Sequence, residues 1–555
     1  MRTLGISAYA RGAAAALVED GVPLAAAAEE RFSRRRGDDA FPLRAARFCL
    51  AEAGTLARDL DAVVLHEKPL RSFEHALASE LAAFPRSAGR FADGAFRWLG
   101  ERLWVKAKIA SQLEVDPRKV LFVAHHDAQA AAAFFASPFD ESAVVVAGGA
   151  GEWASASLAR GSGTSVEPLA EIHKPDSLEL FAAGVRRWAG LAPDLGPGGL
   201  ADLAAAGEPR FAETLREILR VQGDGSFELA PERARLDPVR GLDGELARRL
   251  GPAHLAGAGS PETDAARRDG AASLQLVLEE ALLALARAAH ERTQSERLCL
   301  NGSLARNPSA LARLAVEGPF GALFVPPAAG GSGAALGAAL FVQHAVHGVA
   351  RARDVEQVFL GEGILHEATP AARRLGEDEA PADLARRLGS GVVLGLARGR
   401  FEWSERGLGH RSLLAAPGAE RAAALRKIAR SEGFRSLVCS VPADRAAELF
   451  ELPAAARDLT RFARVLARPR DEGLFASAAN AAGRLRLHAV APSADPWLHR
   501  LLEEVGERSG MPALLHASLR LRGEPLARGA SDALGVFERS ELGALWIEDA
   551  LYERA

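Results

Sequence analysis

The chain has 555 residues, of which 48% are hydrophobic, so it can form more than one buried core and we expect at least two domains. Its 68 basic residues nearly balance its 72 acidic residues, and no cluster of lysine and arginine stands out. The composition therefore argues against nucleic acid and anionic membranes as partners.

The three cysteines, Cys49, Cys299 and Cys439, lie in apolar stretches and are not spaced as metal ligands or as a redox pair. We expect buried free thiols in a reducing compartment. No uncharged apolar run is long enough to cross a membrane, and the first residues lack the features of a signal peptide. These features predict a cytoplasmic protein without membrane association.

The N-terminal part predicts two similar α/β units. Strands are expected, in chain order, at residues 3–7, 13–18, 23–28, 62–65, 120–123, 143–147 and 153–158. Helices are expected from Pro42 and over residues 127–135, and Asp20-Gly21 indicates a hairpin turn between the second and third strands. This repetition predicts a duplicated α/β core.

A glycine-rich loop, Gly330 to Gly333, follows an expected strand at 322–325 and opens a helix at Ala334. Such a loop can present backbone N–H groups to phosphate. A small-residue turn that packs a helix on a sheet has the same pattern, so both interpretations stay open.

A charged segment with Pro370 and Pro381 lacks a sustained apolar period and predicts a domain linker. We therefore place an N-terminal domain at residues 1–360, the linker at 361–384 and a C-terminal domain at 385–555.

Several strings occur in order: LGISAY near the start, AAEERFSRRRGDDAFP at 27–42, HHDAQAAAAFFASPFDESAVVV from 125, GSGAALGAAL at 331–340, GRFEWSERGLGHRS at 399–412 and RGEP at 522–525. On these strings the chain resembles, along nearly its whole length, the carbamoyltransferase family of the nodulation-factor, cephamycin and tobramycin O-carbamoyltransferase type. The resemblance implies an α/β fold, with a duplicated actin/sugar-kinase/Hsp70-like N-terminal domain followed by a YrdC-like α/β C-terminal domain.

The resemblance also implies a reaction. In the family the C-terminal domain makes carbamoyl-adenylate from ATP and carbamoyl phosphate, and the N-terminal domain, which carries a metal ion, delivers the carbamoyl group to a hydroxyl acceptor.

The metal site that the resemblance implies is depleted in this chain. Its ligand positions hold His125, Gln129, Gly148 and Gly331, so only His125 keeps a metal-binding side chain. A carboxamide is a poor replacement for an imidazole that binds iron or zinc. We expect no metal ion, and Glu152 and His126 are the candidates for any remaining catalysis.

The C-terminal domain keeps more of the family's polar residues, and its guanidinium groups could offer forks of donors to phosphate. We expect a site for ATP or carbamoyl phosphate at Arg400, Arg406, Arg411, Ser412, Arg435, Arg486, Ser518, Arg522 and Glu524. Arginines that only pair with carboxylates or lie on a solvated face are an equally weighted alternative.

Three functions stay open. The first is a catalytically degenerate member that acts as a partner or binding subunit of an active carbamoyltransferase paralogue, or as a homodimer, in glycan or natural-product biosynthesis. The second is an active O-carbamoyltransferase with a rebuilt site, acting on a hydroxyl of a sugar or secondary metabolite. The third is a new chemistry in the same clefts. Because framework glycines stay while ligand and proton-carrying residues are replaced, the sequence favours the first.

Overall fold

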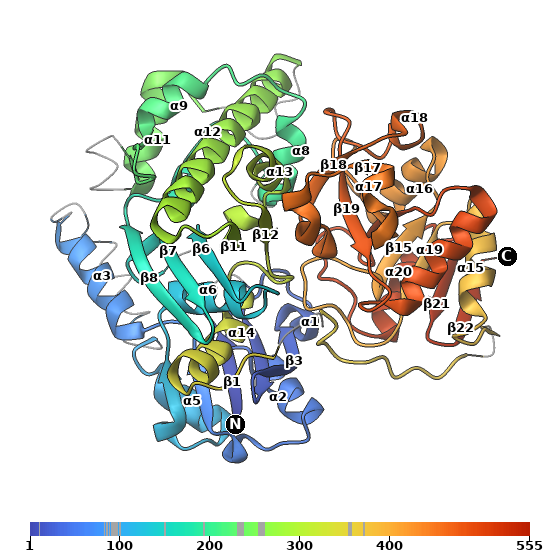
Figure 1. Cartoon of the computed structure of the whole chain (residues 1–555), viewed down its shortest axis with the longest axis horizontal. Helices are drawn as coiled ribbons and strands as arrows, with labels where there is room; N and C mark the ends of the chain where they lie inside the picture. The colour runs from blue at the N-terminus through green and yellow to red at the C-terminus, as the bar shows by residue number, and fades with distance from the viewer. Residues whose placement is uncertain are drawn as a thin grey trace. The chain divides into compact units, whose positions relative to one another are not determined.

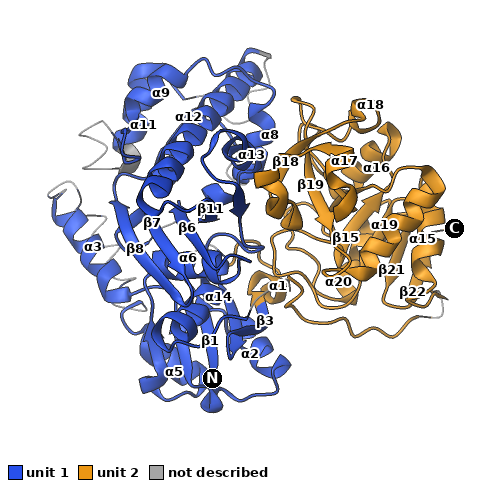
Figure 2. Cartoon of the chain, viewed as in Figure 1, with its two compact units in different colours: residues 1–26, 39–355 blue, residues 27–38, 356–555 orange. Residues whose placement is uncertain are grey.

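The chain divides into two units in the computed structural model (Figure 1). Unit 1 comprises residues 1–26 and 39–355, and unit 2 comprises residues 27–38 and 356–555 (Figure 2). The structure describes residues 1–9, 12–82, 84, 87, 89, 98, 102–148, 151–192, 195–229, 238–253, 261–352, 358–369 and 372–554.

The observed boundaries differ from the predicted ones in three ways. Residues 358–360, expected in the N-terminal domain, belong to unit 2. Segment 27–38, expected in the N-terminal domain, belongs to unit 2. Its Arg31 and Arg34 donate hydrogen bonds to backbone carbonyls of that unit, which is a long-range contact that no local pattern reveals. Helix α15 (Ala380–Gly389) begins inside the predicted linker.

Unit 1 contains two five-stranded sheets with the same topology, in the orders β3-β2-β1-β4-β5 and β8-β7-β6-β11-β12. In each sheet the first strand along the chain pairs antiparallel with the second and parallel with the fourth, which pairs parallel with the fifth. The strands are β1 (Arg2–Ser7), β2 (Ala14–Glu19), β3 (Val22–Ala28), β4 (Ala62–Leu65), β5 (Val120–Phe122), β6 (Glu141–Ala147), β7 (Ala154–Ser162), β8 (Ser165–His173), β11 (Arg297–Asn301) and β12 (Ala322–Phe324). The repeated order confirms the predicted duplicated α/β core.

Two helices made largely of small residues form the layer between these sheets (Figure 1). Helix α14 (Gly333–Leu340) packs on β1 and β2 and against α6 (His125–Phe135), and α6 packs on β6 and β11. A Cβ at Gly337 would lie 1.8 Å from the carbonyl oxygen of Ala128 on α6, and a Cβ at Gly5 would lie 1.8 Å from that of Ala335. Glycine therefore allows the backbones to approach this closely.

The other helices of unit 1 surround this layered core. They include α2 (Leu43–Glu52), α3 (Pro69–Ala82), α5 (Val105–Leu113), α7 (Leu178–Trp188), α8 (Gly196–Ala204), α9 (Ala212–Ile218), α11 (Pro238–Leu250), α12 (Pro261–Thr293) and α13 (Pro308–Glu317). The long helix α12 contacts β6, α7, α8, α9 and α13. Nowhere in the described ranges does a helix have the length and apolar character needed to cross a membrane.

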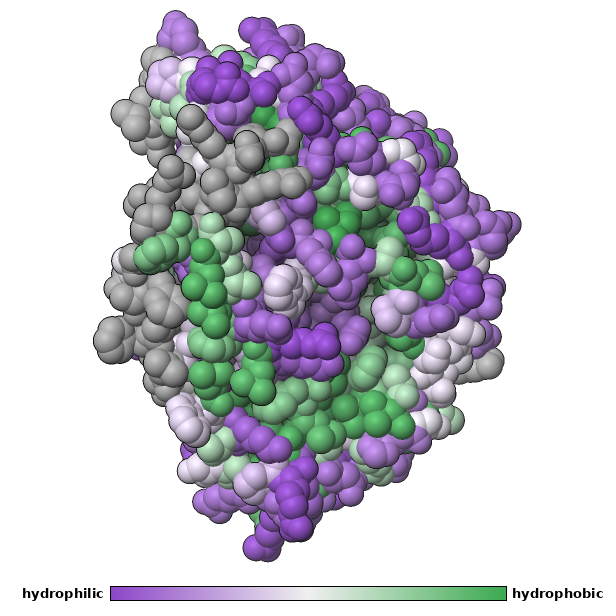
Figure 3. Space-filling model, turned by 90° about the vertical axis from the view of Figure 1, so that its left-hand side faces the viewer, coloured by the Kyte–Doolittle hydropathy of each residue, from purple (hydrophilic) through white to green (hydrophobic). Residues whose placement is uncertain are grey.

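Helix α3 differs from the others in how little of it is buried. Only Pro69 and Ser72 are buried, whereas Leu70 and Leu81 are exposed by 74% and 66%. The side view in Figure 3 shows hydrophobic surface gathered in continuous areas beside hydrophilic ones. Unit 1 thus carries apolar side chains on its surface as well as in its core.

Unit 2 is built on one ten-stranded mixed sheet in the order β13-β22-β21-β14-β15-β20-β16-β19-β18-β17. Its strands are β13 (Arg373–Arg374), β14 (Leu394–Ala397), β15 (Arg411–Ala415), β16 (Val438–Pro442), β17 (Phe450–Glu451), β18 (Val465–Pro469), β19 (Leu485–Val490), β20 (Leu514–Ser518), β21 (Ala544–Ile547) and β22 (Ala550–Glu553). Its helices include α1 (Glu30–Ser33), α15, α16 (Ala419–Ala429), α17 (Ala446–Leu449), α18 (Glu472–Phe475), α19 (Pro496–Ser509) and α20 (Ala530–Arg539). The predicted α/β class is therefore confirmed in both units.

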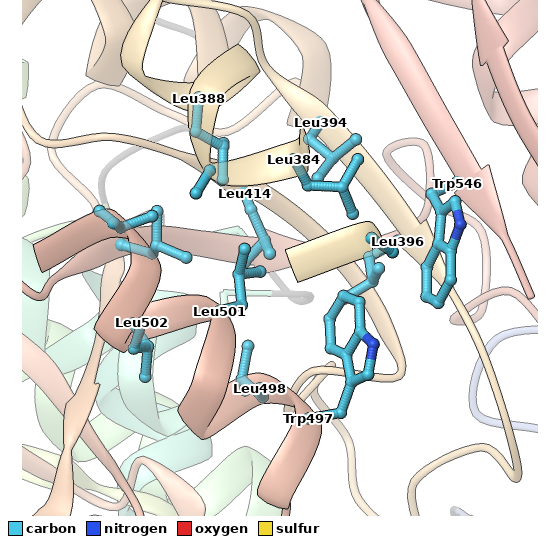
Figure 4. Close-up of a cluster of buried hydrophobic side chains, with 14 of the residues drawn as sticks. Leu384, Leu388, Leu394, Leu396, Leu414, Trp497, Leu498, Leu501, Leu502 and Trp546 are labelled. Carbon is cyan, nitrogen blue, oxygen red and sulfur yellow. The ribbon is translucent and has the colours of Figure 1, made fainter. Parts of the chain in front are cut away.

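Helices α15 and α19 bury one end of a sheet face under an apolar cluster (Figure 4). Leucines of both helices meet Leu394, Leu396 and Leu414 of β14 and β15, and the rings of Trp497 and Trp546 stack with centroids 4.8 Å apart. Residues 412, 440, 488, 516 and 518 continue this face away from the cluster and are polar. The sheet face is thus divided into an apolar half and a polar half.

The close approach of α6 and α14 predicts that a larger residue at Gly337 destabilises unit 1. In Gly337→Ala the new methyl group must displace the Ala128 carbonyl or helix α14 itself. The free energy of unfolding should therefore fall by about 3 kcal/mol or more, which is the upper end of the usual cost of overpacking a core. Chemical denaturation would measure the change. Gly244 in α11 is the matched control, because no atom lies within 4 Å of its Cβ position. There alanine should stabilise by about 0.5–1 kcal/mol. Equal effects at the two positions would contradict the packing argument.

Candidate functional site

The end of β11 at Asn301 and the two residues after it gather the ligand positions expected in unit 1. The amide nitrogen of Asn301 donates to the backbone carbonyl of Gln129 at 2.8 Å, and its amide oxygen accepts from the N–H of Gly330 at 2.8 Å. A Cβ at Gly148 would lie 2.1 Å from Oγ of Ser303. The region that the family pattern assigns to the metal therefore forms one place in unit 1, although residues 149 and 150 of its hairpin lie outside the described ranges.

Within α6, Gln129 binds directly to His125. The two Nε2 atoms are 2.5 Å apart, and both side chains are buried. Because an amide nitrogen can only donate, the imidazole Nε2 accepts, and the lone pair that would coordinate a metal is occupied. Burial lowers the pKa of His125 well below 6.5, and the neighbouring His66 and Lys174 lower it further, so the ring is neutral.

Glu152 supports the start of α6. Its carboxylate accepts hydrogen bonds from the backbone N–H of His125, at 3.1 and 3.2 Å, and from that of Lys68 at 2.7 Å. A carboxylate there compensates the positive end of the helix dipole. Burial raises the pKa of Glu152, and the backbone donors oppose that rise.

His126 points toward β7 instead. Its Nδ1 lies 2.8 Å from Oγ of Ser157, and burial lowers its pKa to about 3. Gly151 is needed beside it, because a Cβ there would meet Cδ2 of His126 at 2.6 Å. His126 is therefore a packed, neutral imidazole whose Nε2 makes no hydrogen bond within the described part of the chain.

The residues at this place do not fit an iron or zinc ion. Such an ion needs several imidazole, thiolate or carboxylate ligands around one point. Here the Nε2 of His125 is taken by Gln129, the Glu152 carboxylate by backbone N–H groups, and Gly148 and Gly331 offer no side chain. Among the described residues no group of three or more histidines, cysteines and acidic residues could hold a metal.

In unit 2, one buried carboxylate organises the loop before β15. Oε1 of Glu402 accepts hydrogen bonds from three backbone N–H groups, those of Leu408 at 2.8 Å and of His410 and Arg411 at 2.9 Å. Burial lowers the pKa of Arg31 and of Arg411 to about 10, and the Glu402 charge opposes that fall in both. Glu402 thus supplies the acceptor for three of the backbone N–H groups of this loop.

Several arginines predicted to bind phosphate hold the backbone of unit 2. The fully buried guanidinium of Arg411 donates to the carbonyl oxygens of residues 398, 399, 410 and 528, at 2.5–3.1 Å. Arg400 donates to those of Leu360 and Gly361 at 2.9 and 2.8 Å. Arg411 and Arg400 therefore hold neighbouring backbone segments of unit 2 together by hydrogen bonds.

Other predicted residues form surface pairs. Arg435 and Arg522 both bind Glu432, at 2.7 and 2.9 Å, and Glu524 binds Arg539 at 2.8 Å. Ser518 and Ser412 hold the loop, since they accept from the N–H of Gly407 at 3.1 Å and of Gly409 at 2.9 Å. Arg486 is buried on β19. Among the predicted residues, Arg406 acts by its charge on the group of positive charges that follows.

That group centres on Arg520, just after β20. Burial lowers the pKa of Arg520 to about 10, and the charges of Arg36, Arg406 and Arg31 lower it further, against a single carboxylate, Glu30. Within the described residues, no hydrogen bond or ion pair engages the Arg520 guanidinium. Buried charge without a partner is costly, so this arrangement favours a bound anion.

A chain of hydrogen-bonded side chains crosses the polar half of the sheet. Ser412 Oγ lies 2.6 Å from Nε2 of His516, whose Nδ1 lies 3.0 Å from Oγ of Ser440, and that hydroxyl lies 3.0 Å from Nδ1 of His488. Burial lowers the pKa of His516 to about 3 and of His488 to about 4, so both rings are neutral. The chain links β15, β20, β16 and β19.

The sequence did not single out Arg520, Ser440 or His488. A signal was present for Arg520, because it lies between Ser518 and Arg522, two residues that the resemblance assigns to phosphate. His516 binds Ser412 and Ser440, and Asp532 accepts from the N–H of Arg528, so these two residues do not combine with Ser518 as a catalytic triad.

Comparisons with known proteins cover both units. Residues 2–340 match the family model described as Carbamoyltransferase N-terminus, and residues 385–554 match the model described as Carbamoyltransferase C-terminus.

Three relatives illustrate the range of similarity. The protein sll1178 of Synechocystis sp. is 33% identical over 98% of this chain and 95% of its own length. The nodulation protein NolNO of Sinorhizobium fredii is 28% identical over 98% of this chain and 78% of its own. A 3'-hydroxymethylcephem-O-carbamoyltransferase of Amycolatopsis lactamdurans is 28% identical over 54% of this chain and 56% of its own.

Solved structures are more distant. HypF of T. kodakarensis gives a TM-score of 0.33 at 15% identity, covering 63% of this chain and 48% of its own. Component A of the (R)-2-hydroxyglutaryl-CoA dehydratase of Acidaminococcus fermentans gives 0.36 at 13% identity, covering 62% of this chain and 99% of its own. These scores are too low to add to the argument.

The role of Glu402 predicts a local loss of structure. Glu402→Ala removes the acceptor of three buried N–H groups, and each charge-assisted hydrogen bond contributes about 1.5–3 kcal/mol, so unit 2 should lose at least about 3 kcal/mol. Hydrogen exchange would show faster exchange of the amides of residues 408, 410 and 411. Glu420→Ala, an exposed position on α16, is the control and should change little. Unchanged protection of these amides in Glu402→Ala would contradict this role.

Proposed function

Because the chain belongs to the carbamoyltransferase family, we propose that it is a member whose unit 1 delivers no carbamoyl group, and which serves an active carbamoyltransferase as a binding partner. The observation that carries this proposal is the contact between Gln129 and His125, which occupies the lone pair needed for a metal. The fold is kept while the chemistry that it would support is removed.

The polar groups around this contact support the same conclusion. Glu152 is committed to the N-terminus of α6, and His126 is a neutral ring whose pKa lies near 3. A general base works best when its pKa lies near the working pH. Neither side chain has the environment of an activated base for an acceptor hydroxyl.

Unit 2 supplies the binding role in this proposal. The guanidinium of Arg520 lies near Arg406, Arg36 and Arg31 without a hydrogen-bonded partner of its own in the described residues. Guanidinium groups bind phosphate oxygens strongly and with defined geometry. We propose that a phosphorylated ligand, ATP or carbamoyl phosphate, binds here.

A second candidate rests on a different observation. Three buried polar atoms in unit 1, Nδ1 of His66, Nε2 of His126 and Oε1 of Gln129, lack hydrogen-bond partners within the described residues. Buried polar atoms are normally satisfied, so these favour a water molecule or a ligand at this place. That observation supports an active O-carbamoyltransferase with a rebuilt site, using Glu152 and His126 on a sugar or secondary-metabolite hydroxyl.

A transfer assay separates the two candidates. The purified chain, incubated with ATP, carbamoyl phosphate, Fe²⁺ or Zn²⁺ and 3'-hydroxymethylcephem, should form no carbamoylated product by mass spectrometry, because the described residues at the expected metal position do not fit such an ion. The Amycolatopsis lactamdurans transferase is the positive control. Turnover by the chain alone that is lost in His126→Ala would establish the second candidate.

The partner role has its own measurement. Adding the chain to an active carbamoyltransferase of the same organism should raise the rate of transfer or lower the KM for carbamoyl phosphate. Absence of any effect would contradict that part of the proposal.

Restoring the ligand positions tests the reason for the lost activity. The variant combines Gln129→His, Gly148→Asp and Gly331→Asp with Ser303→Gly, because Oγ of Ser303 would meet the new side chain at 148. Elemental analysis should find iron or zinc in this variant at a higher ratio than in the natural chain. The variant with Ser303→Gly alone is the control. Equal metal content in the natural and restored chains would contradict the loss of the site.

The phosphate site predicts a contrast between two nearby arginines. Arg520→Met should weaken binding of ATP or carbamoyl phosphate by about 1.5–3 kcal/mol, roughly 10- to 150-fold, because a charged phosphate contact is lost. Arg522→Met is the matched control, since Arg522 is exposed and paired with Glu432. Calorimetric titration would measure both. Equal affinities in the two variants would place any phosphate elsewhere.

A further inference from the structure

Unit 2 contains a cavity that neither the family pattern nor the proposed function accounts for. Its volume is about 560 Å³, within the range of sites for small organic ligands. Apolar side chains form much of its wall, among them Leu408, Phe462 and Val490. The ring of Phe359 completes this wall and is held by stacking on His410, with centroids 3.5 Å apart and planes 8° from parallel.

The charged groups of the lining balance one another. Asp444 and Asp458 face the same cavity as Arg457 and Arg461. The remaining carboxylate, that of Asp495, already pairs with Arg398 and accepts from the N–H of Leu498. An uncharged ligand therefore fits this lining better than a cation or an anion.

Two polar groups of the lining have capacity left for a ligand. The half-buried carboxylate of Asp458 makes no hydrogen bond or ion pair within the described residues, and burial raises its pKa. His488 uses Nδ1 for Ser440, and no described residue bonds to its Nε2. A carboxylate accepts only, whereas a neutral imidazole nitrogen donates or accepts according to its tautomer.

The hydrogen bond at Nδ1 of His488 fixes the orientation of its ring. The chain of hydrogen bonds through Ser440 and His516 to Ser412 anchors the ring in the sheet, and the N–H of Gly409 anchors that end of the chain. Such buried networks hold their members in one arrangement when all are satisfied. The cavity thus has a prepared polar atom as well as an apolar wall.

We propose that this cavity binds a small uncharged ligand that carries hydroxyl groups on a compact carbon frame, namely a cyclic polyol or a monosaccharide. Its hydroxyls donate to Asp458 and bond to Nε2 of His488, and its C–H face packs against Phe359. A ligand of this class supplies the donors that Asp458 lacks and adds no charge to a balanced lining. The site is distinct in chemistry from the cationic group around Arg520, which calls for an anion.

Saturation-transfer NMR on the full chain tests the proposal with four named ligands: D-glucose, D-galactose, N-acetyl-D-glucosamine and myo-inositol. At least one should receive saturation from the natural chain. Asp458→Ala should weaken that binding at least tenfold, and Ala447→Trp should abolish it by filling the cavity from an exposed lining position on α17.

Matched controls keep the test specific. Glu451→Ala and Ala454→Trp change exposed residues outside the lining and should bind as the natural chain does. Circular dichroism of each variant would confirm that it is folded. The proposal is overturned if none of the four ligands receives saturation, or if saturation persists unchanged in both Asp458→Ala and Ala447→Trp.

Discussion

The arrangement of unit 1 depends on the close approach of α14 to β1 and α6. At Gly337 and Gly5 a Cβ would lie 1.8 Å from a carbonyl oxygen, so the layers can pack only where side chains are missing. This constraint fixes the position of α6, and with it the direction of His125, His126 and Gln129. Replacement of such a packing glycine would cost the fold, whatever side chains stand at the neighbouring polar positions.

The side chains at the expected metal position of unit 1 satisfy one another by hydrogen bonds and packing. Gln129 satisfies His125, Glu152 satisfies the first N–H of α6, and the space beside Gly148 is filled by Ser303. In this network the lone pair of the His125 imidazole has a hydrogen-bond donor within the chain, Gln129. The orphaned atoms of His66, His126 and Gln129 are the exception, and they mark where water or a ligand would be expected.

Unit 2 contains both charged side chains that hold the backbone and one, Arg520, that lies among like charges. Three buried charged side chains, those of Glu402, Arg411 and Arg31, form hydrogen bonds with backbone groups. These bonds give the loop before β15 a defined conformation. Arg520 has no such partner in the described residues and lies among like charges. Beyond it, the hydroxyl and imidazole chain leads across the sheet to the cavity lined by His488.

The sequence by itself determined the α/β class and the duplicated core, because strand spacing, glycine turns and ordered strings are local properties of the chain. It predicted a phosphate site from arginines without distinguishing those that bind ligand from those that hold backbone. Arg411 and Arg520 look alike in sequence, and only the tertiary structure showed that carbonyl oxygens surround one guanidinium and like charges surround the other. The membership of segment 27–38 in unit 2 and the line from Ser412 to His488 were likewise decided by contacts between residues far apart in the chain, which no local pattern contains.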